Sequence, residues 1–411
     1  KLLPRERGKF LRAIGNQLRE NAELLGKIET IDTGKLFRET NKQANYIAEY
    51  YDYYAGLADK VEGTVLPIDK PNVQAITTRI PIGVVAAIVP WNSQMFLTAT
   101  KLAPALAMGN TVVIKSSELA PAVMFEFAKL IEKTGIPKGV VNVVTGFGQE
   151  VGEPLVDHPE VRMISFTGSI SGGRRVAEVA ARQIKPVVME LGGKSPQIVF
   201  SDVKLDDAAH GVALGLFPPA GQSCVAGSRL LVQREIQDEL VQKICSVASQ
   251  ARLGPPLASD TQIGPMANET HFERVIGYIE QARNEGAECV LGGKAAKPEG
   301  TAGWFIEPTI FRNVSPEMQI FREELFGPVL AVVPFEDEEE AIRLANDTVY
   351  GLAAGIWTGD ATRAIRIAER IQAGTIYVNN YFNSATQSPV GGYKQSGYGR
   401  ENGIEGMLSF R

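Results

Sequence analysis

The sequence predicts an α/β protein made of a doubly wound parallel sheet, a second α/β unit and a protruding β-hairpin. Two observations predict this class. From residue 82 onward, short continuous apolar runs alternate with stretches of helical periodicity, as in a parallel sheet covered by helices on both faces. Before residue 82, prolines and β-branched residues interrupt the helical pattern, which indicates an extended hairpin.

The first elements are helical. Residues 4–31 have the periodicity of one helix, with Pro4 in its first turn and Gly34 beyond its end. A second helix is predicted over residues 41–58. Its tyrosines favour a core or a subunit contact over a ligand-binding box; they are Tyr46, Tyr50, Tyr51, Tyr53 and Tyr54. Residues 63–81 then form the predicted hairpin.

The alternating region contains two series of strands and helices. The first has the apolar runs VVAAIVP, TVVIK, VNVVTG, MISFTG and VVMELGG, with helices near 94–107, 120–133, 149–156 and 171–183. The second follows Cys224, with the runs RLLVQ, PVLAVVPF, LAAGIWT and TIYVNN and helices near 234–251, 269–285, 337–346 and 361–372. Each series therefore predicts its own α/β unit.

Composition excludes several classes of function. The 411 residues carry a net charge of −5, which does not suit a nucleic-acid or anionic-membrane surface. The apolar runs are too short to span a bilayer. Three cysteines are too few for a disulfide framework and predict a reducing, cytoplasmic location. The three histidines lack zinc-ligand spacing, so no metal site is expected.

Polar residues follow four predicted strands at the points where those strands end. They are Asn92, Lys115 with Glu118, Gly168 with Ser169, and Glu190. Ligands of doubly wound sheets bind beyond these carboxyl ends. The run GSISGG opens a helix whose amides and dipole suit a pyrophosphate, although the GxGxxG fingerprint is absent. The carboxylate of Glu118 would accept hydrogen bonds from the ribose hydroxyls and would repel a 2′-phosphate. It therefore favours NAD over NADP.

Cys224 lies in the stretch AGQSCVAGSR, where small residues flank it on both sides. Most free cysteines are small buried hydrophobes, and Cys245 and Cys289 are interpreted in this way. The neighbours of Cys224 instead suit the close approach of a substrate carbonyl to sulfur. Because an ordinary thiol is mostly protonated at neutral pH, a nucleophilic cysteine needs a nearby base. Glu190 is the candidate base, provided that burial raises its pKa.

Seven segments carry a family resemblance, and they occur in order along essentially the whole chain. They are PWN (90–92), IKSSE (114–118), FTGS (166–169), MELGGKSP (189–196), FPPAGQSC (217–224), EELFGPV (323–329) and GGYKQSG (391–397). Together they resemble the NAD(P)-dependent aldehyde dehydrogenase superfamily, of the non-acylating type. The resemblance implies oxidation of an aldehyde to a carboxylic acid through a thiohemiacetal and a thioester.

The resemblance also implies roles for particular residues. Cys224 would be the nucleophile, and Asn92 would hold the oxyanion together with the Cys224 amide. Glu190 would activate the hydrolytic water, and Lys101 would help to relay protons. The residues implied to bind the cofactor are Val89, Pro90, Trp91, Lys115, Glu118, Gly168, Ser169, Gly173, Leu191, Glu324 and Phe326.

The implied domains follow from the same resemblance. A Rossmann-like dinucleotide-binding domain covers 1–62 and 82–192, and the hairpin at 63–81 serves oligomerisation. The catalytic domain covers 193–395, and a C-terminal return segment covers 396–411. The expected assembly is a homodimer or a homotetramer if the chain termini are complete. This condition matters because family members usually have more residues at the N-terminus and a further C-terminal strand.

Two alternatives stay open. A CoA-acylating semialdehyde dehydrogenase would pass the acyl group to CoA, although such enzymes tend to lack the carboxylate of Glu190. A binding or structural protein could have kept the fold and lost the activity. The aldehyde is not readable from the sequence; the specificity loops are expected around Phe96, Phe217, Pro218 and residues 381–389, where no cationic cluster suits a dicarboxylic semialdehyde.

Overall fold

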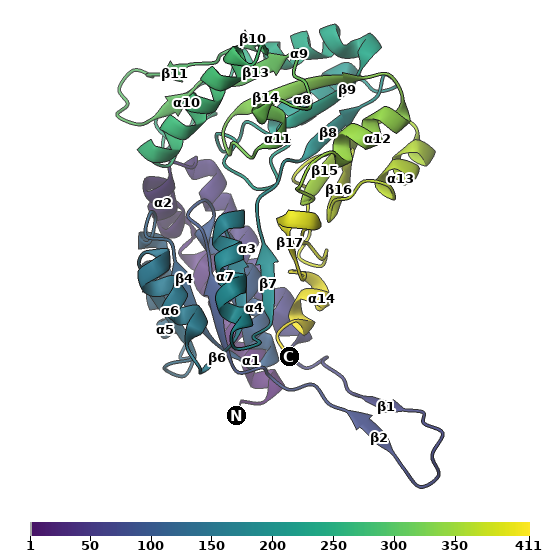
Figure 1. The fold of residues 1–411 in the computed structure, drawn as a ribbon. Helices are drawn as coiled ribbons and strands as arrows, with labels where there is room; N and C mark the ends of the chain where they lie inside the picture. Colours follow the sequence, from purple (N-terminus) through teal and green to yellow (C-terminus); the bar gives the residue numbers. More distant parts are fainter. Residues whose placement is uncertain (1) are drawn as a thin grey trace.

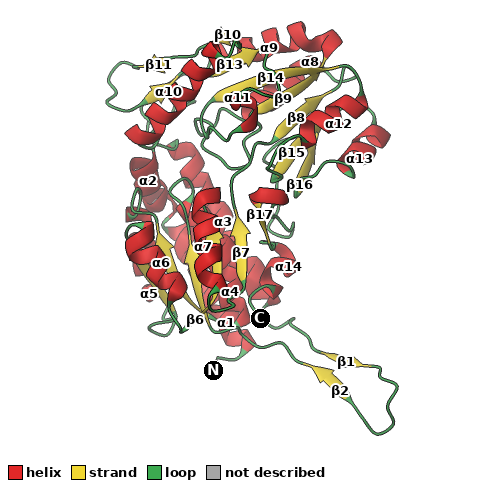
Figure 2. Cartoon of the chain, in the orientation of Figure 1, coloured by secondary structure: helices red, strands yellow, loops and turns green. Residues whose placement is uncertain are grey.

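Two mixed sheets, each with helices packed against its faces, make up the body of the protein in the computed structural model, which describes residues 2–411 (Figures 1 and 2). The predicted α/β class with a doubly wound domain is confirmed. A hairpin projects from the first part, formed by β1 (Thr64–Leu66) and β2 (Ala75–Thr77) paired antiparallel. None of the helices in the described part of the chain has the length and apolarity that membrane crossing requires.

The first helical region contains three helices, α1 (Pro4–Glu20), α2 (Ala22–Thr33) and α3 (Phe37–Leu57). The prediction of one helix over 4–31 is wrong, because the chain breaks at Asn21. The Asn21 side chain donates to the Gln17 carbonyl at 2.8 Å and so ends α1. Gly34 ends α2 in the left-handed conformation, with φ of 78°. Of the tyrosines on α3, Tyr50, Tyr51 and Tyr54 are fully buried in the core.

The first sheet has the strand order β17-β7-β6-β3-β4-β5 and is parallel except for β17. Its strands are β3 (Val84–Ile88), β4 (Thr111–Ser116), β5 (Val141–Thr145), β6 (Val161–Thr167), β7 (Val187–Glu190) and β17 (Gly397–Tyr398). The helical segments between them are α4 (Gln94–Met108), α5 (Ala122–Lys133), η1 (Gly148–Gly152), α6 (Glu153–Asp157) and α7 (Ile170–Ala181). The order reverses at β3, and the register aligns Ile88 with Lys115 and Phe166, so the strands end at one common edge.

The second sheet has the order β10-β13-β14-β9-β8-β15-β16, with only β10 antiparallel. Its strands are β8 (Pro196–Val199), β9 (Arg229–Gln233), β10 (Glu288–Leu291), β13 (Thr309–Arg312), β14 (Val329–Phe335), β15 (Ala353–Trp357) and β16 (Thr375–Val378), and a small ribbon joins β11 (Ala295–Ala296) to β12 (Phe305–Ile306). The helices of this part are α8 (Leu205–Leu214), η2 (Arg234–Ile236), α9 (Gln237–Ser249), α10 (Glu269–Asn284), α11 (Gln319–Arg322), α12 (Glu338–Asn346) and α13 (Ala361–Ala368). After β16 the chain returns to the first sheet through η3 (Lys394–Ser396) and β17, and α14 (Gly403–Leu408) follows.

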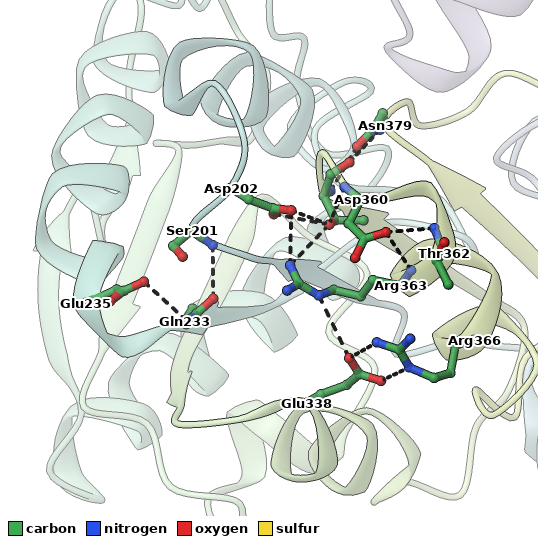
Figure 3. Close-up of polar contacts among 11 residues, drawn as sticks. Ser201, Asp202, Gln233, Glu235, Glu338, Asp360, Thr362, Arg363, Arg366 and Asn379 are labelled. Carbon is green, nitrogen blue, oxygen red and sulfur yellow. Dashed lines mark hydrogen bonds and ion pairs between the residues drawn. The ribbon is translucent and has the colours of Figure 1, made fainter.

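The carboxyl edge of the second sheet is closed by its own polar side chains (Figure 3). Asp202, just beyond β8, accepts a hydrogen bond from Thr358 beyond β15 and pairs with Arg363 at 3.1 Å. Arg363 lies over the Phe200 ring, and Asp360 caps α13 by accepting from the Thr362 amide at 2.8 Å. The edge where a doubly wound sheet usually binds ligands is therefore occupied here, and Cys224 lies instead in the segment before β9.

Candidate active site

The segment that carries Cys224 is held by close backbone contacts. Gly221 has φ of 70°, and a Cβ at this position would lie 2.1 Å from the Gly327 carbonyl oxygen. On the other side, a Cβ at Gly193 would lie 2.3 Å from the carbonyl oxygen of Cys224. Only glycine permits these approaches. The small residues around Cys224 thus allow three separate loops to meet at the cysteine.

Gln222 and Asn92 connect this segment to the rest of the site. Gln222 is 3% exposed, and its side-chain oxygen accepts from the Ala267 amide at 2.9 Å. Its own carbonyl accepts from Asn92 Nδ2 at 3.1 Å. Asn92 follows β3 of the first sheet, whereas Cys224 precedes β9 of the second. The structure therefore brings the predicted side-chain amide to the cysteine segment from the other sheet.

The thiol of Cys224 is a poor acid in its resting state. Burial raises its pKa to about 12, helped by the carboxylates of Glu324 and Glu190 and opposed by hydrogen bonds from the amides of Cys224 and Val225. The thiol is therefore protonated at neutral pH, and attack on a carbonyl requires that a base take its proton. Both carboxylates lie within electrostatic range of the sulfur.

Glu190 is the last residue of β7 and is 8% exposed. Its Oε1 has no hydrogen-bond partner among residues 2–411. Burial first, and then the nearby Glu401, raise the pKa of Glu190 well above its usual range, while Lys101 and Arg400 oppose the shift. A carboxylate with a raised pKa is a stronger base, and a free oxygen atom can accept a proton from a thiol or from water.

Lys101 is fully buried and does not reach Cys224 through any contact in the described structure. Its ammonium group donates to Thr167 Oγ1 at 2.7 Å and pairs with Glu401. Thr167 lies opposite Glu190 in the pairing of β6 with β7. Lys101 is thus one strand away from the candidate base. The sequence reasoning missed Glu401, because the partner of Lys101 lies 300 residues further along the chain.

A pocket of about 630 Å³ opens at the carboxyl ends of β3, β4 and β6. Six of the predicted cofactor residues line it: Val89, Pro90, Lys115, Glu118, Gly168 and Ser169. The sequence reasoning missed Phe147 and Arg175, which also line it. Its volume, a helix N-terminus and a carboxylate at a strand end fit the adenosine and pyrophosphate of a dinucleotide.

Contacts within this pocket show how its residues are placed. Lys115 Nζ lies 3.1 Å from Glu118 Oε2. Ser169 Oγ caps α7 by accepting from the Gly172 amide at 3.1 Å. Gly173 and Leu191 lie in a separate groove of about 150 Å³, where a Cβ at Gly173 would come within 2.6 Å of the Leu191 side chain. These two residues therefore pack α7 against the sheet.

Glu324 and Phe326 approach the site from the loop before β14. Glu324 Oε1 accepts from the Gly193 amide at 3.0 Å, and burial raises the pKa of Glu324 to about 7. Phe326 has φ of 61°, a strained value for a side chain of this size. Its ring meets Trp91 edge-on with centroids 5.6 Å apart. His271, missed by the sequence reasoning, packs on both rings and bonds the Phe326 carbonyl through Nε2 at 2.7 Å.

The arrangement combines covalent chemistry with a nucleotide-sized pocket. A protonated thiol, a side-chain amide and a basic carboxylate gather where the two sheets face each other. Such a set can add sulfur to a carbonyl, hold the oxyanion and later activate water. The pocket at the edge of the first sheet continues toward this point through Thr167, which pairs with Glu190, and through Pro90, which precedes Trp91 and Asn92.

Comparisons with known proteins give consistent matches. The profile of the aldehyde dehydrogenase family matches residues 1–411. A (Z)-2-((N-methylformamido)methylene)-5-hydroxybutyrolactone dehydrogenase from Acinetobacter baylyi is 46% identical over 407 residues, covering 98% of this chain and 83% of that protein. Betaine aldehyde dehydrogenase from Bacillus subtilis is 43% identical over 406 residues, with the same coverage.

Solved structures agree with these matches. Betaine aldehyde dehydrogenase from Staphylococcus aureus, in complex with NAD+, superposes with a TM-score of 0.98 at 39% identity, covering 100% of this chain and 82% of that one. An NAD-dependent aldehyde dehydrogenase from Sinorhizobium meliloti gives a TM-score of 0.97 at 39% identity, covering 100% and 81%.

Proposed function

This chain belongs to the aldehyde dehydrogenase family and oxidises an aldehyde with NAD through a cysteine, and we propose that Cys224, Glu190 and Asn92 carry that reaction. The observation that supports this assignment most strongly is the hydrogen bond between Asn92 Nδ2 and the Gln222 carbonyl. It joins the amide that follows β3 to the cysteine segment. The contact keeps the amide that would stabilise the oxyanion next to the segment that carries the nucleophile.

In the first step, Cys224 Sγ adds to the aldehyde carbon and gives its proton to Glu190, directly or through water. The oxygen of the thiohemiacetal lies between Asn92 Nδ2 and the Cys224 amide, which stabilise negative charge there. Bound NAD supplies the acceptor for the hydride that leaves this carbon, and the carbon becomes a thioester. Glu190 passes this first proton on toward solvent and, ionised again, takes a proton from the water that attacks the thioester. The carboxylic acid leaves, and the proton held by Glu190 returns to the Cys224 sulfur, which restores the thiol.

Two buried groups support Glu190 in this scheme. Lys101 and Glu401 form an ion pair beside Thr167, and Glu401 also accepts from Ser165 Oγ at 3.2 Å. We assign this network to proton transfer away from Glu190. It also adjusts the base, because Glu401 raises the pKa of Glu190 and Lys101 lowers it.

The residues that would hold NAD divide into two groups. Lys115 and Glu118 would bind the adenosine ribose, and Gly168 with Ser169 would present the start of α7 to the pyrophosphate. Glu324 would bind the nicotinamide ribose, with Phe326 beside the nicotinamide. The remaining set lines the cleft or packs α7 behind it: Val89, Pro90, Trp91, Gly173 and Leu191. The carboxylate of Glu118 supports a preference for NAD over NADP.

The assignment is tested by mixing the purified protein with NAD and a panel of aldehydes, with and without CoA. The formation of NADH is recorded by its absorbance at about 340 nm. NADH and a free carboxylic acid are expected in the absence of CoA. Strict dependence on CoA would replace the hydrolytic assignment by the acylating one. A folded protein that binds NAD and releases no NADH would support the binding-protein alternative.

Asn92→Ala is expected to lower kcat by about a hundred- to a thousand-fold, the usual effect of removing one oxyanion donor. The Michaelis constant for NAD should change little, because the amide lies at the cysteine segment. Steady-state kinetics with aldehyde and NAD varied separately measure both effects. Asn142→Ala, at an exposed asparagine on β5, is the matched control and should keep wild-type rates. An Asn92→Ala enzyme with near-normal kcat would remove Asn92 from the mechanism.

The quaternary structure and the location are further proposals. The hairpin exposes Val65 and Ile76 by 59% and 61%, and an isolated two-stranded ribbon is marginally stable in water. We therefore assign residues 63–81 to contacts within a homodimer or homotetramer. The two sheets support the predicted division of the chain. Its parts are a dinucleotide-binding domain of residues 1–62 and 82–192, a catalytic domain of residues 193–395 and a C-terminal return segment of residues 396–411. The three unpaired cysteines support a reducing compartment such as the cytoplasm.

A further inference from the structure

An aromatic cluster lies where α3 and α4 pack together, one helical turn beyond Asn92. The rings of Tyr46 and Phe96 are nearly parallel, with centroids 6.2 Å apart and an angle of 17° between their planes. Tyr50 meets both rings edge-on, at 5.5 and 5.6 Å. Tyr50 is fully buried, whereas Tyr46 and Phe96 keep part of their surface exposed. The cluster is thus anchored on one side and accessible on the other.

A hydrogen bond links this cluster to the loop after β16. The Tyr46 hydroxyl donates to the Ser384 carbonyl at 3.4 Å, which places the cluster beside the loop 381–389. Burial raises the pKa of Tyr377 to about 12, with smaller contributions from Cys224 and Tyr46, so the Tyr377 hydroxyl lies within electrostatic range of both. The loop after β16 therefore borders the aromatic cluster.

A second aromatic wall comes from β16 and the loop after it. The rings of Tyr377 and Tyr381 are 4.8 Å apart, and Phe382 meets Tyr381 edge-on at 5.2 Å. The Tyr381 hydroxyl donates to the carbonyl of Val225, the residue after Cys224, at 2.9 Å. Phe382 is 37% exposed. Rings from β16 and from the loop after it therefore lie beside the cysteine segment.

The loop beside the cluster offers no charged group to a charged substrate. The loop 381–389 reads YFNSATQSP and contains no lysine, arginine, aspartate or glutamate. A carboxylate on the substrate would lose its water without gaining a cation. A quaternary ammonium group needs an open ring face, and the rings of Tyr46 and Phe96 already pack against each other and against Tyr50. Ring edges and hydroxyls suit a flat, neutral ring.

We propose that this enzyme takes an uncharged aromatic aldehyde, whose ring packs against Phe96 and Tyr46 while its carbonyl carbon meets Cys224. The proposal rests on the proposed function and adds the class of substrate. Phe96 and Tyr46 are then specificity-determining residues. They take no part in the bond-breaking steps, so a small aldehyde should not need them.

The test compares kcat/KM for benzaldehyde, acetaldehyde, betaine aldehyde and succinate semialdehyde in the wild type and in Phe96→Ala, Phe96→Leu and Tyr46→Ala. The wild type should favour benzaldehyde over the other three. Phe96→Ala should lower the ratio of kcat/KM for benzaldehyde to kcat/KM for acetaldehyde by about tenfold. Phe96→Leu keeps the bulk and should still lower that ratio. Phe125→Ala, at a 41% exposed phenylalanine on α5, is the matched control.

The outcomes separate this inference from the proposed function. Preference for betaine aldehyde or succinate semialdehyde, or an unchanged ratio in every variant, would overturn the aromatic assignment and leave aldehyde oxidation in place. Absence of NADH formation from all four aldehydes by folded wild-type enzyme would overturn the proposed function and this inference together. If Phe96→Ala does not fold, the ratios for Phe96→Leu and Tyr46→Ala decide.

Discussion

Replacing Cys224 with alanine is expected to abolish aldehyde oxidation, with kcat falling by about four orders of magnitude or more. Without sulfur, no thiohemiacetal forms, and neither Asn92 nor Glu190 can act on the carbonyl carbon. The variant should fold normally, because the loss of one sulfur atom leaves the contacts of Gln222 and Gly193 in place. NADH formation measures the loss, and binding of NAD should persist.

The other two cysteines provide matched controls for this result. Cys245 lies on α9 and Cys289 on β10, both within the second α/β unit. Cys245→Ala and Cys289→Ala should keep kcat within about twofold of the wild type. A small substitution away from the active site acts mainly on the stability of the fold. Residual turnover by Cys224→Ala near the wild-type rate, or inactivation by either control alone, would move the nucleophile away from Cys224.

Glu190→Gln is expected to lower steady-state kcat by about a hundred- to ten-thousand-fold. The amide has the shape of the carboxylate and cannot take a proton. Hydrolysis should suffer more than acylation, because water is a weaker acid than the Cys224 thiol, whose pKa is about 12. The thioester should accumulate, which gives a burst of about one NADH per active site and an acyl adduct in the mass of the intact protein.

The pH profile provides a second readout for Glu190. The residue acts as a base only when ionised, and its pKa is raised above the usual range, chiefly by burial. Wild-type kcat should therefore fall as the pH decreases through that raised pKa, at a pH above the ordinary value of a glutamate. Glu190→Gln should lose this acidic limb. Glu405→Gln, at an exposed residue of α14, should keep it. Equal losses of burst and steady rates, without an acyl adduct, would contradict the assignment.

Local sequence patterns predicted most of the first sheet. The strands β3, β4, β5 and β6 are continuous apolar runs, and each is followed by a helical segment that the parallel connection requires. The pattern failed at the break after α1, because the apolar periodicity continues on both sides of Asn21. It also missed β8, since PQIV follows directly on the glycine turn after Glu190 and β7. Neither feature changes the local hydrophobicity enough to mark a boundary.

The chemistry of single residues was more predictable than their partners. Strand ends pointed to Asn92 and Glu190, and small neighbours pointed to Cys224. The ion pair of Lys101 with Glu401 joins residues 300 positions apart, and no local pattern connects them. The support of Phe326 by His271 has the same origin. Contacts of this kind form when whole helices and strands pack together, so local patterns in a single sequence do not reveal them.

The strand β17 has a consequence for how the chain is made. It covers the edge of β7, pairing Gly397 with Glu190, and Ser396 Oγ donates to the Gly192 carbonyl across 204 residues of intervening chain. At 5–20 residues per second, the ribosome takes roughly 10 to 40 seconds to add that stretch. Throughout this interval the nascent β7 has an unpaired edge, which is a site for aggregation. The edge of β7 is therefore covered by its own chain only after Gly397 has left the exit tunnel.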